Sequence, residues 1–123
     1  MAITFLHTVP ILRMFSLEKA KEFYIGYLGF KVDWEHQFPG AKPVYMQVSR
    51  DGLVLHLSEH YGDGTPGTAI YVDMQGVEEF HRELTAKNYD YLRPGLEKTD
   101  WNTLSVNVID PFGNKIRFNE SMR

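Results

Sequence analysis

The chain has 123 residues, 43% of them hydrophobic and 14% aromatic, and 13 Lys and Arg against 16 Asp and Glu give a net charge of −3. This profile is typical of one compact globular domain, and the lack of cysteine excludes disulfides, thiolate metal sites and catalytic thiols. The mild charge argues against nucleic-acid and membrane partners, no apolar run reaches the roughly 20 residues that span a bilayer, and the N-terminus lacks a signal-peptide pattern, so we expect a cytoplasmic protein.

The first half of the chain predicts a strand, a helix and three further strands. Residues 3–13 have a strand pattern, and Ser16 is a plausible N-cap for a helix whose apolar positions recur at helical spacing until Gly29. The strands that follow are expected at residues 30–36, 44–49 and 53–58, with Arg50-Asp51-Gly52 as a hairpin turn between the last two.

The second half repeats this order after a Gly-rich linker at residues 61–67. It predicts a strand at 68–73, a helix at 77–87, and strands at 89–93, 103–109 and 115–118, with Asp110-Pro-Phe-Gly113 as the late turn. We therefore predict an α+β fold in a single domain, residues 1–123, built from two βαβββ modules that cover about residues 1–61 and 66–123.

Alternation along the predicted strands gives each sheet one apolar face and one semi-polar face. The semi-polar positions are Tyr45, Gln47, His56, Ser58, Asn107 and Arg117. An open antiparallel sheet that simply faces water is the plain alternative. Such faces usually carry Lys, Glu and Thr, whereas this set of Tyr, His, Gln, Ser and Asn is typical of a cavity lining, so we interpret it as a ligand-binding face.

Several motifs together resemble the vicinal oxygen chelate superfamily, which includes glyoxalase I, extradiol dioxygenases and bleomycin-resistance proteins. They are Pro10-Ile-Leu-Arg13, Glu22-Phe-Tyr24 followed by Leu28-Gly-Phe30, Tyr45-Met46 ahead of Leu53-Val-Leu-His56, and Asp110-Pro-Phe-Gly-Asn-Lys115. Trp101, nine residues before Asp110, is similar to a tryptophan of the antibiotic-binding branch. The resemblance implies the glyoxalase/bleomycin-resistance fold with curled mixed sheets, a homodimer, and ligand pockets within the sheets or between subunits.

The resemblance also places the metal-ligand positions of the superfamily's enzymes on this chain. They fall on Val9, His56, about Gly67 (with Thr68 and Ala69 beside it) and Arg117. Only His56 could coordinate a metal, and a divalent ion needs at least three protein ligands. We therefore expect no metal and no cofactor.

Two other arrangements of histidines could indicate a metal site. His56-Leu-Ser-Glu59-His60 matches a zinc-protease string that works only on a helix, and on the predicted strand the two histidines lie roughly 13 Å apart at ~3.3 Å per residue. His7 lies on the face of Val9 and could approach His56 as a two-histidine site. For each histidine, a hydrogen-bonded pocket or surface role is the plainer interpretation.

The two tryptophans are further candidates for ligand contact. Trp101 lies in a polar loop, where an indole more often caps a pocket or forms an interface than packs in a core. For Trp34 a core role is an equal alternative, because Phe30, Val32 and Trp34 share one face of the predicted strand. Residues 38–43 are expected to form a loop at the pocket mouth.

These observations favour a metal-free protein that binds a planar or aromatic small molecule, with a bleomycin-like glycopeptide antibiotic as one candidate ligand. The alternatives are a lyase or dioxygenase-like enzyme that uses His56 with an atypical or absent metal, and a module that binds only protein. Neither a nucleophile elbow nor a phosphate loop is present, while acid–base roles for His56, Glu59 or His60 stay open. The candidate ligand-binding residues are Trp34, Tyr45, Gln47, His56, Ser58, His60, Trp101, Asn107 and Arg117.

Overall fold

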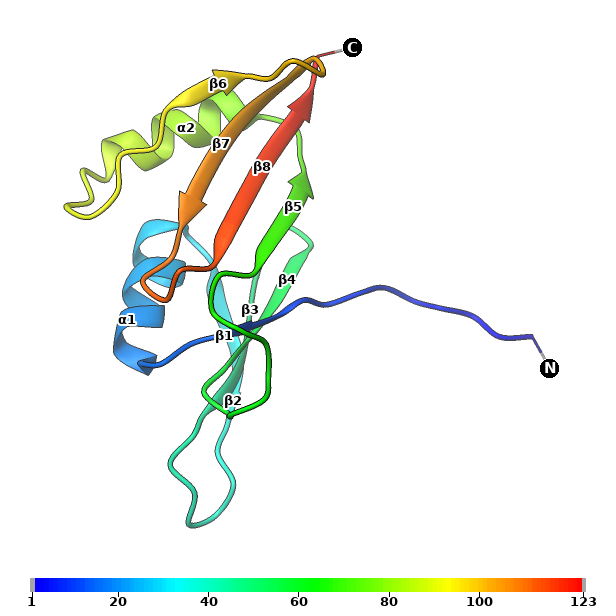
Figure 1. The fold of residues 1–123 in the computed structure, drawn as a ribbon, viewed down its shortest axis with the longest axis vertical. Helices are drawn as coiled ribbons and strands as arrows, with labels where there is room; N and C mark the ends of the chain where they lie inside the picture. Colours follow the sequence, from blue (N-terminus) through cyan, green and yellow to red (C-terminus); the bar gives the residue numbers. More distant parts are fainter. Residues whose placement is uncertain (1, 123) are drawn as a thin grey trace.

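A computed structural model describes residues 2–122 and has two four-stranded sheets, one in each module (Figure 1). The first sheet has the order β1-β4-β3-β2, with β1 Ile11–Arg13, β2 Lys31–His36, β3 Tyr45–Arg50 and β4 Leu53–Ser58. The second sheet has the order β5-β8-β7-β6, with β5 Ala69–Asp73, β6 Leu96–Lys98, β7 Thr103–Ile109 and β8 Lys115–Ser121. The strand that opens each module pairs in parallel with the last strand, and the other pairs are antiparallel. The predicted α+β fold of two βαβββ modules is confirmed.

One helical segment precedes β2 and another precedes β6. α1, Leu17–Lys21, begins at Ser16, whose hydroxyl accepts a hydrogen bond from the Lys19 amide at 3.1 Å. It continues directly into a π-helix, η1, Glu22–Tyr27, which the sequence pattern did not distinguish from an α-helix. α2, Val77–Ala86, packs against β7 and β8. Among the described residues, no helix is long and apolar enough to cross a membrane.

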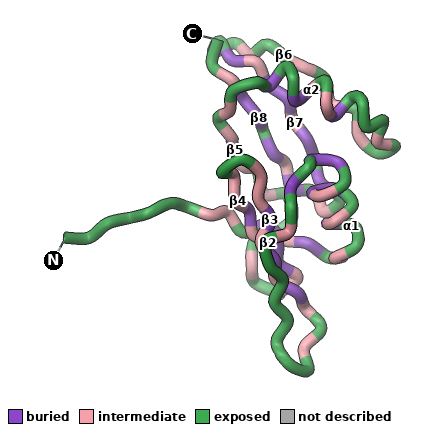
Figure 2. The backbone as a smooth tube through the Cα atoms, turned by 180° about the vertical axis from the view of Figure 1, so that it is seen from behind, coloured by how far each residue is buried: buried purple, intermediate pink, exposed green. Residues whose placement is uncertain are grey.

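A buried hydrogen-bond network joins the first module to the late turn of the second. The Tyr24 hydroxyl donates to Asp110 Oδ2 at 2.6 Å, and Asp110 Oδ1 accepts from the amides of Phe112 and Asn114. The Asn114 side chain donates to the carbonyl of Arg13 at 2.8 Å. Burial raises the pKa of Tyr24, and the charge of Asp110 raises it further, so the phenol stays a donor. The Asp-Pro-x-Gly turn therefore holds the two modules together. Figure 2 shows the buried residues along β7 and β8, the strands on either side of this turn.

The strand predicted at residues 3–13 is too long. Only Ile11–Arg13 is a strand, and residues 2–9 form an extended N-terminal arm that leaves the body of the molecule (Figure 1). Its Ile3, Phe5 and Leu6 are 85%, 94% and 84% exposed. The reason is that the arm finds no neighbouring strand along its length within the single chain, so its strand-like pattern has no ladder to join.

The strand predicted at residues 89–93 is also wrong, because the sixth strand lies at Leu96–Lys98. The Tyr89 ring stacks on the Tyr27 ring of η1 at a centroid distance of 4.6 Å, and the Tyr89 hydroxyl donates to Glu22 at 3.3 Å. Burial, followed by the charge of Glu22, raises the pKa of Tyr89 to about 12. The Tyr89 ring of this segment therefore packs on a helix and not in the sheet.

Candidate ligand-binding site

The semi-polar face of the first sheet holds a chain of hydrogen bonds that starts at Tyr45. Its hydroxyl lies 2.6 Å from His56 Nδ1, and His56 Nε2 lies 2.9 Å from Gln47 Oε1. The Gln47 amide nitrogen donates to Asp33 Oδ2 at 3.0 Å. Because Asp33 only accepts, the Gln47 amide nitrogen faces it, and Gln47 Oε1 accepts from His56 Nε2–H. In the neutral imidazole, Nδ1 then accepts from the Tyr45 hydroxyl, so both ring nitrogens are engaged.

The pKa shifts agree with this arrangement. Burial lowers the pKa of His56, which disfavours the imidazolium form. Burial raises the pKa of Tyr45, and the negative charge of Asp63 adds to the effect. The hydrogen bond from Gln47, helped by one from Ser49, lowers the pKa of Asp33. At neutral pH the face thus carries a neutral phenol, a neutral imidazole and a carboxylate.

A β-bulge brings Trp34 onto this face. The pairing of β2 with β3 passes from Val32 opposite Val48 to Trp34 opposite Gln47, so one extra residue, Asp33, lies between the two pairs. The alternative that Trp34 shares the core face of Val32 is therefore wrong. The indole stacks on the Tyr45 ring at 5.9 Å with an interplanar angle of 8° and meets the His56 ring edge-on.

A cavity of about 400 Å³ opens beside these rings, where the loop between β2 and β3 meets the segment after β4. We call it the aromatic pocket; it is lined by Trp34, His36, Phe38, Tyr45, His60 and Asp63. The Ser58 hydroxyl donates to Asp63 Oδ2 at 2.8 Å and accepts from the amide of His60 at 3.0 Å, so Ser58 supports the pocket wall from behind. His60 Nε2 is buried and has no hydrogen-bond partner.

The second sheet places its candidates elsewhere. Asn107 and Arg117 lie opposite each other on β7 and β8, on a face that also carries Ser105 and Asn119. Trp101, 62% exposed, lies in the turn between β6 and β7, at the other end of the molecule from the loop between β2 and β3 (Figure 1). Within one chain, the structure therefore gathers six of the nine candidates and leaves three apart: Asn107, Arg117 and Trp101.

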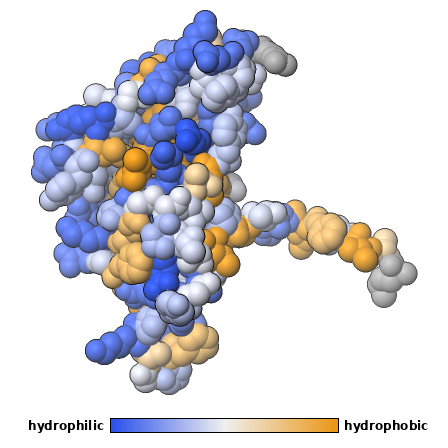
Figure 3. Space-filling model, viewed as in Figure 1, coloured by the Kyte–Doolittle hydropathy of each residue, from blue (hydrophilic) through white to orange (hydrophobic). Residues whose placement is uncertain are grey.

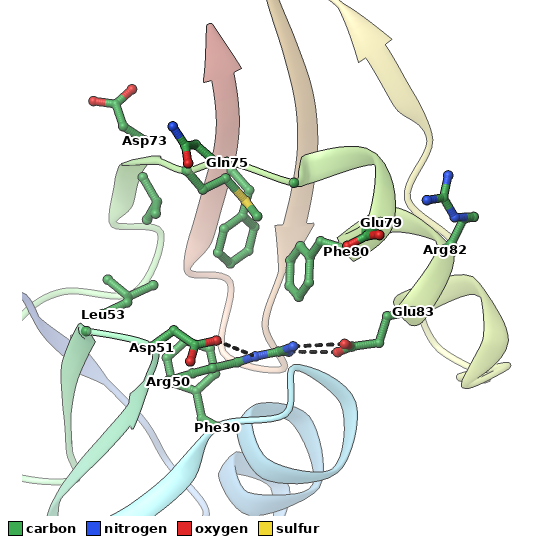
Figure 4. Close-up of a pocket in the computed structure, with 15 residues that line it drawn as sticks. Phe30, Arg50, Asp51, Leu53, Asp73, Gln75, Glu79, Phe80, Arg82 and Glu83 are labelled. Atoms are coloured by element: carbon green, nitrogen blue, oxygen red, sulfur yellow. Dashed lines mark hydrogen bonds and ion pairs between the residues drawn. The ribbon is translucent and has the colours of Figure 1, made fainter.

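A larger cavity of about 860 Å³ lies between the two modules (Figure 4). Its walls include Phe30, Phe80 and Phe118, and Arg50 reaches across it to Glu83 with two hydrogen bonds of 2.7 and 2.8 Å. The hydrogen bonds from Arg50 lower the pKa of Glu83. Arg50 also donates to the carbonyl of Leu28. The charged groups at the centre of the cavity satisfy each other, so the pair joins the modules.

Sequence reasoning missed several of these residues. Asp63 had no signal, because it lies in a Gly-rich linker that looks like a plain turn. Alternation places Asp33 opposite Val32 and so on the polar face, but nothing in the sequence pairs it with Gln47. Arg50 and Glu83 lie 33 residues apart and share no motif. Phe38 was placed in the expected loop at the pocket mouth, and the structure places its ring in the pocket wall.

The residues do not fit a metal centre. Among residues 2–122, no three His, Cys, Asp or Glu side chains come together in a way that could hold a metal ion. His56 has no free nitrogen, and His7 lies in the exposed N-terminal arm, outside the pairing of β1 with β4. His56 belongs to a strand, so the zinc-protease interpretation also fails.

A family model described as glyoxalase superfamily protein matches residues 1–123. No functionally curated protein matches the chain. Its fold is similar to that of the bleomycin resistance determinant encoded on the transposon Tn5, at 19% identity and a TM-score of 0.73, with 97% of this chain and 100% of the other covered.

Two further solved structures are similar over nearly their whole length. One is TnmS3, an antibiotic binding protein from Streptomyces sp. CB03234, at 22% identity and a TM-score of 0.68, covering 98% of each chain. The other is a bleomycin-binding protein from bleomycin-producing Streptomyces verticillus, complexed with copper(II)-bleomycin, at 23% identity and a TM-score of 0.69, covering 95% of this chain and 97% of that one. At these identities the likeness concerns the fold.

Proposed function

Because the chain belongs to the glyoxalase superfamily, we propose that it is a metal-free small-molecule-binding protein that holds an aromatic ligand against the rings of the first sheet. The observation that carries this proposal is the stacked pair Trp34 and Tyr45 beside a cavity of about 400 Å³. The indole is 41% exposed, so a planar ligand can stack on it and remove apolar surface from water.

The hydrogen-bond chain supports binding over catalysis. General acid–base work by His56 needs a ring nitrogen that can reach a substrate, and both nitrogens are engaged by Tyr45 and Gln47. The same bonds hold the Tyr45 ring in place, which favours a preorganised binding surface. Antibiotic-binding proteins with this fold make an antibiotic such as bleomycin the first ligand to test.

The test is a calorimetric titration of the protein with metal-free bleomycin, which does not depend on tryptophan as a reporter. We expect saturable binding, and Trp34→Ala should weaken it by about tenfold or more, which corresponds to about 1.4 kcal/mol. Tyr91→Ala, which removes an aromatic ring that is 74% exposed in the second module, is the control and should change nothing. Saturable binding that Trp34→Ala leaves intact would overturn this placement of the ligand, and absence of binding would remove bleomycin as the ligand.

We also propose that two copies associate through the N-terminal arm. Its Ile3, Phe5 and Leu6 are apolar and almost fully exposed. Figure 3 shows the arm projecting from the body with hydrophobic residues along it. Within residues 2–122, β4 pairs with β1 only from His56 onward, so no strand pairs with residues 53–55 on that side. An arm from a second copy would bury the apolar side chains, and association is the route by which Trp101 could reach another copy's aromatic pocket.

Light scattering at micromolar concentration tests this association. We expect a mass of about twice 14.3 kDa for the full chain and a single-chain mass for a variant that lacks residues 2–9. A full-length monomer would contradict the dimer, and a dimer of the shortened variant would contradict the role of the arm.

A further inference from the structure

We propose that the aromatic pocket recognises an organic cation, such as a substituted ammonium group carried by the ligand. This inference rests on the proposed function and adds the chemical class of the group that enters the pocket. The lining consists of the five rings of Trp34, His36, Phe38, Tyr45 and His60 together with one carboxylate, Asp63. No Lys or Arg contributes to this lining.

The orientation of the rings favours a rounded group over a flat one. Trp34 and Tyr45 are nearly parallel and form one wall. Phe38 stands at 89° to the ring of His36 and at 86° to the ring of His60, with centroids 4.5 and 5.8 Å apart. Some of the rings that line the cavity therefore lie in planes at right angles to one another, and aromatic ring faces attract a compact cation through their quadrupoles.

Asp63 supplies the negative charge that such a group needs. Its Oδ2 accepts a hydrogen bond from the neutral Ser58 hydroxyl, and no ion pair joins it to a cationic side chain within residues 2–122. Its charge reaches the pocket interior, because it contributes to the raised pKa of Tyr45. A carboxylate that no cation compensates, beside electron-rich ring faces, attracts a positive ligand and repels an anionic one.

The aromatic pocket differs in this respect from the cavity between the modules. There the central carboxylate, Glu83, is already paired with Arg50 through two hydrogen bonds (Figure 4). In the aromatic pocket the corresponding partner is missing, and the buried Nε2 of His60 also has no partner. The cavity between the modules therefore contains its own cation, Arg50, whereas the aromatic pocket is complementary to a cation from outside the chain.

A pair of isosteric probes tests the charge requirement. Choline and 3,3-dimethylbutan-1-ol have nearly the same shape, and only choline is charged. The chain has two tryptophans, so the indole N–H resonances of Trp34 and Trp101 report separately on the pocket and on a distant turn. We expect choline to shift the Trp34 resonance saturably, to leave that of Trp101 in place, and to bind at least about tenfold more tightly than the neutral alcohol.

The variant Asp63→Asn should weaken choline binding by about tenfold and leave the alcohol unaffected. The amide oxygen of asparagine can still accept from Ser58, so the fold is kept, and Asp90→Asn, at an exposed position in the second module, controls for the change in net charge. Equal affinities for the two probes, or no shift of the Trp34 resonance with either, would overturn the proposal. Bleomycin binding that still depends on Trp34 would then leave the proposed function standing, whereas bleomycin binding that does not depend on Trp34 would overturn the placement of the ligand as well.

Discussion

In the first sheet, the face opposite the core carries the stacked rings of Trp34 and Tyr45 and a hydrogen-bond chain that ends at Asp33. In the second sheet, β7 and β8 take the places that β3 and β4 have in the first sheet, and they carry Asn107 and Arg117. The two modules share one topology, so the topology alone does not make a binding surface. The difference arises from one inserted residue in β2 and from Phe38 in the loop that follows this strand.

The late turns of the two modules differ in how deeply their aspartates are buried. Asp110 is 4% exposed and accepts hydrogen bonds from three residues, whereas the side chain of Asp51, in the corresponding turn of the first module, is 93% exposed. The first module therefore carries the candidate site, and the second supplies the buried anchor that holds the modules together. Substitutions in the two modules should separate these roles.

The largest expected effect is on folding, from Asp110→Asn. The amide cannot accept all the hydrogen bonds that the carboxylate accepts, and its N–H group would face the donating hydroxyl of Tyr24. We expect a loss of about 2–4 kcal/mol in the free energy of unfolding, measured by urea denaturation. Asp51→Asn, at a residue with φ 47° that asparagine tolerates, should cost less than about 0.5 kcal/mol. Similar losses for the two variants would mean that the late turns are equivalent.

A smaller effect is expected from Arg50→Lys, which tests the link between the modules. Lysine cannot form the two parallel hydrogen bonds that the Arg50 guanidinium makes with Glu83. We expect a loss of about 1 kcal/mol in stability, because the pair is partly exposed. Arg82→Lys, whose partner Glu78 lies 3.8 Å away on the surface of α2, is the matched control and should be neutral. An equal response of the two variants would contradict a linking role for Arg50.

The smallest effect concerns the pH dependence of stability. Burial lowers the pKa of His56 below the unfolded value of about 6.5, so the unfolded chain takes up this proton first as the pH falls. This contribution to stability is therefore present above pH 6.5 and is lost as the pH falls toward the lowered pKa. Between pH 7 and pH 5 the urea midpoint of His56→Gln should fall less than that of the wild type. His81→Gln, in the second module, controls for the loss of a histidine; the same change in pH dependence there would refute the prediction.

Local patterns predicted the elements whose partners lie nearby in the sequence. The strand at residues 53–58 and the Arg50-Asp51-Gly52 turn agree with the structure, because alternation and two residues with positive φ suffice to define a hairpin. Tyr45, Gln47 and His56 were predicted to share a face, and the register places Gln47 opposite His56. The resemblance to the superfamily further predicted that the two modules form the curled mixed sheets of one fold.

Features that depend on distant neighbours could not be predicted. The pattern at residues 3–13 indicates a strand, but a strand needs a partner, and only Ile11–Arg13 has one. In residues 89–93 the Tyr89 ring packs on η1, and periodicity cannot distinguish this packing from packing in a sheet. The bulge at Asp33 changes the face of Trp34, and a single inserted residue leaves no mark in the composition of the strand.

The central claim is that the ligand binds on the aromatic face of the first sheet. The most direct measurement is a titration of isotope-labelled protein with metal-free bleomycin, followed through every assigned backbone amide. The account predicts that the largest shifts fall on β2, β3 and β4 and on the loop that carries Phe38, around the rings of Trp34 and Tyr45. Shifts confined to β7 and β8, or to the cavity around Arg50 and Glu83, would contradict it.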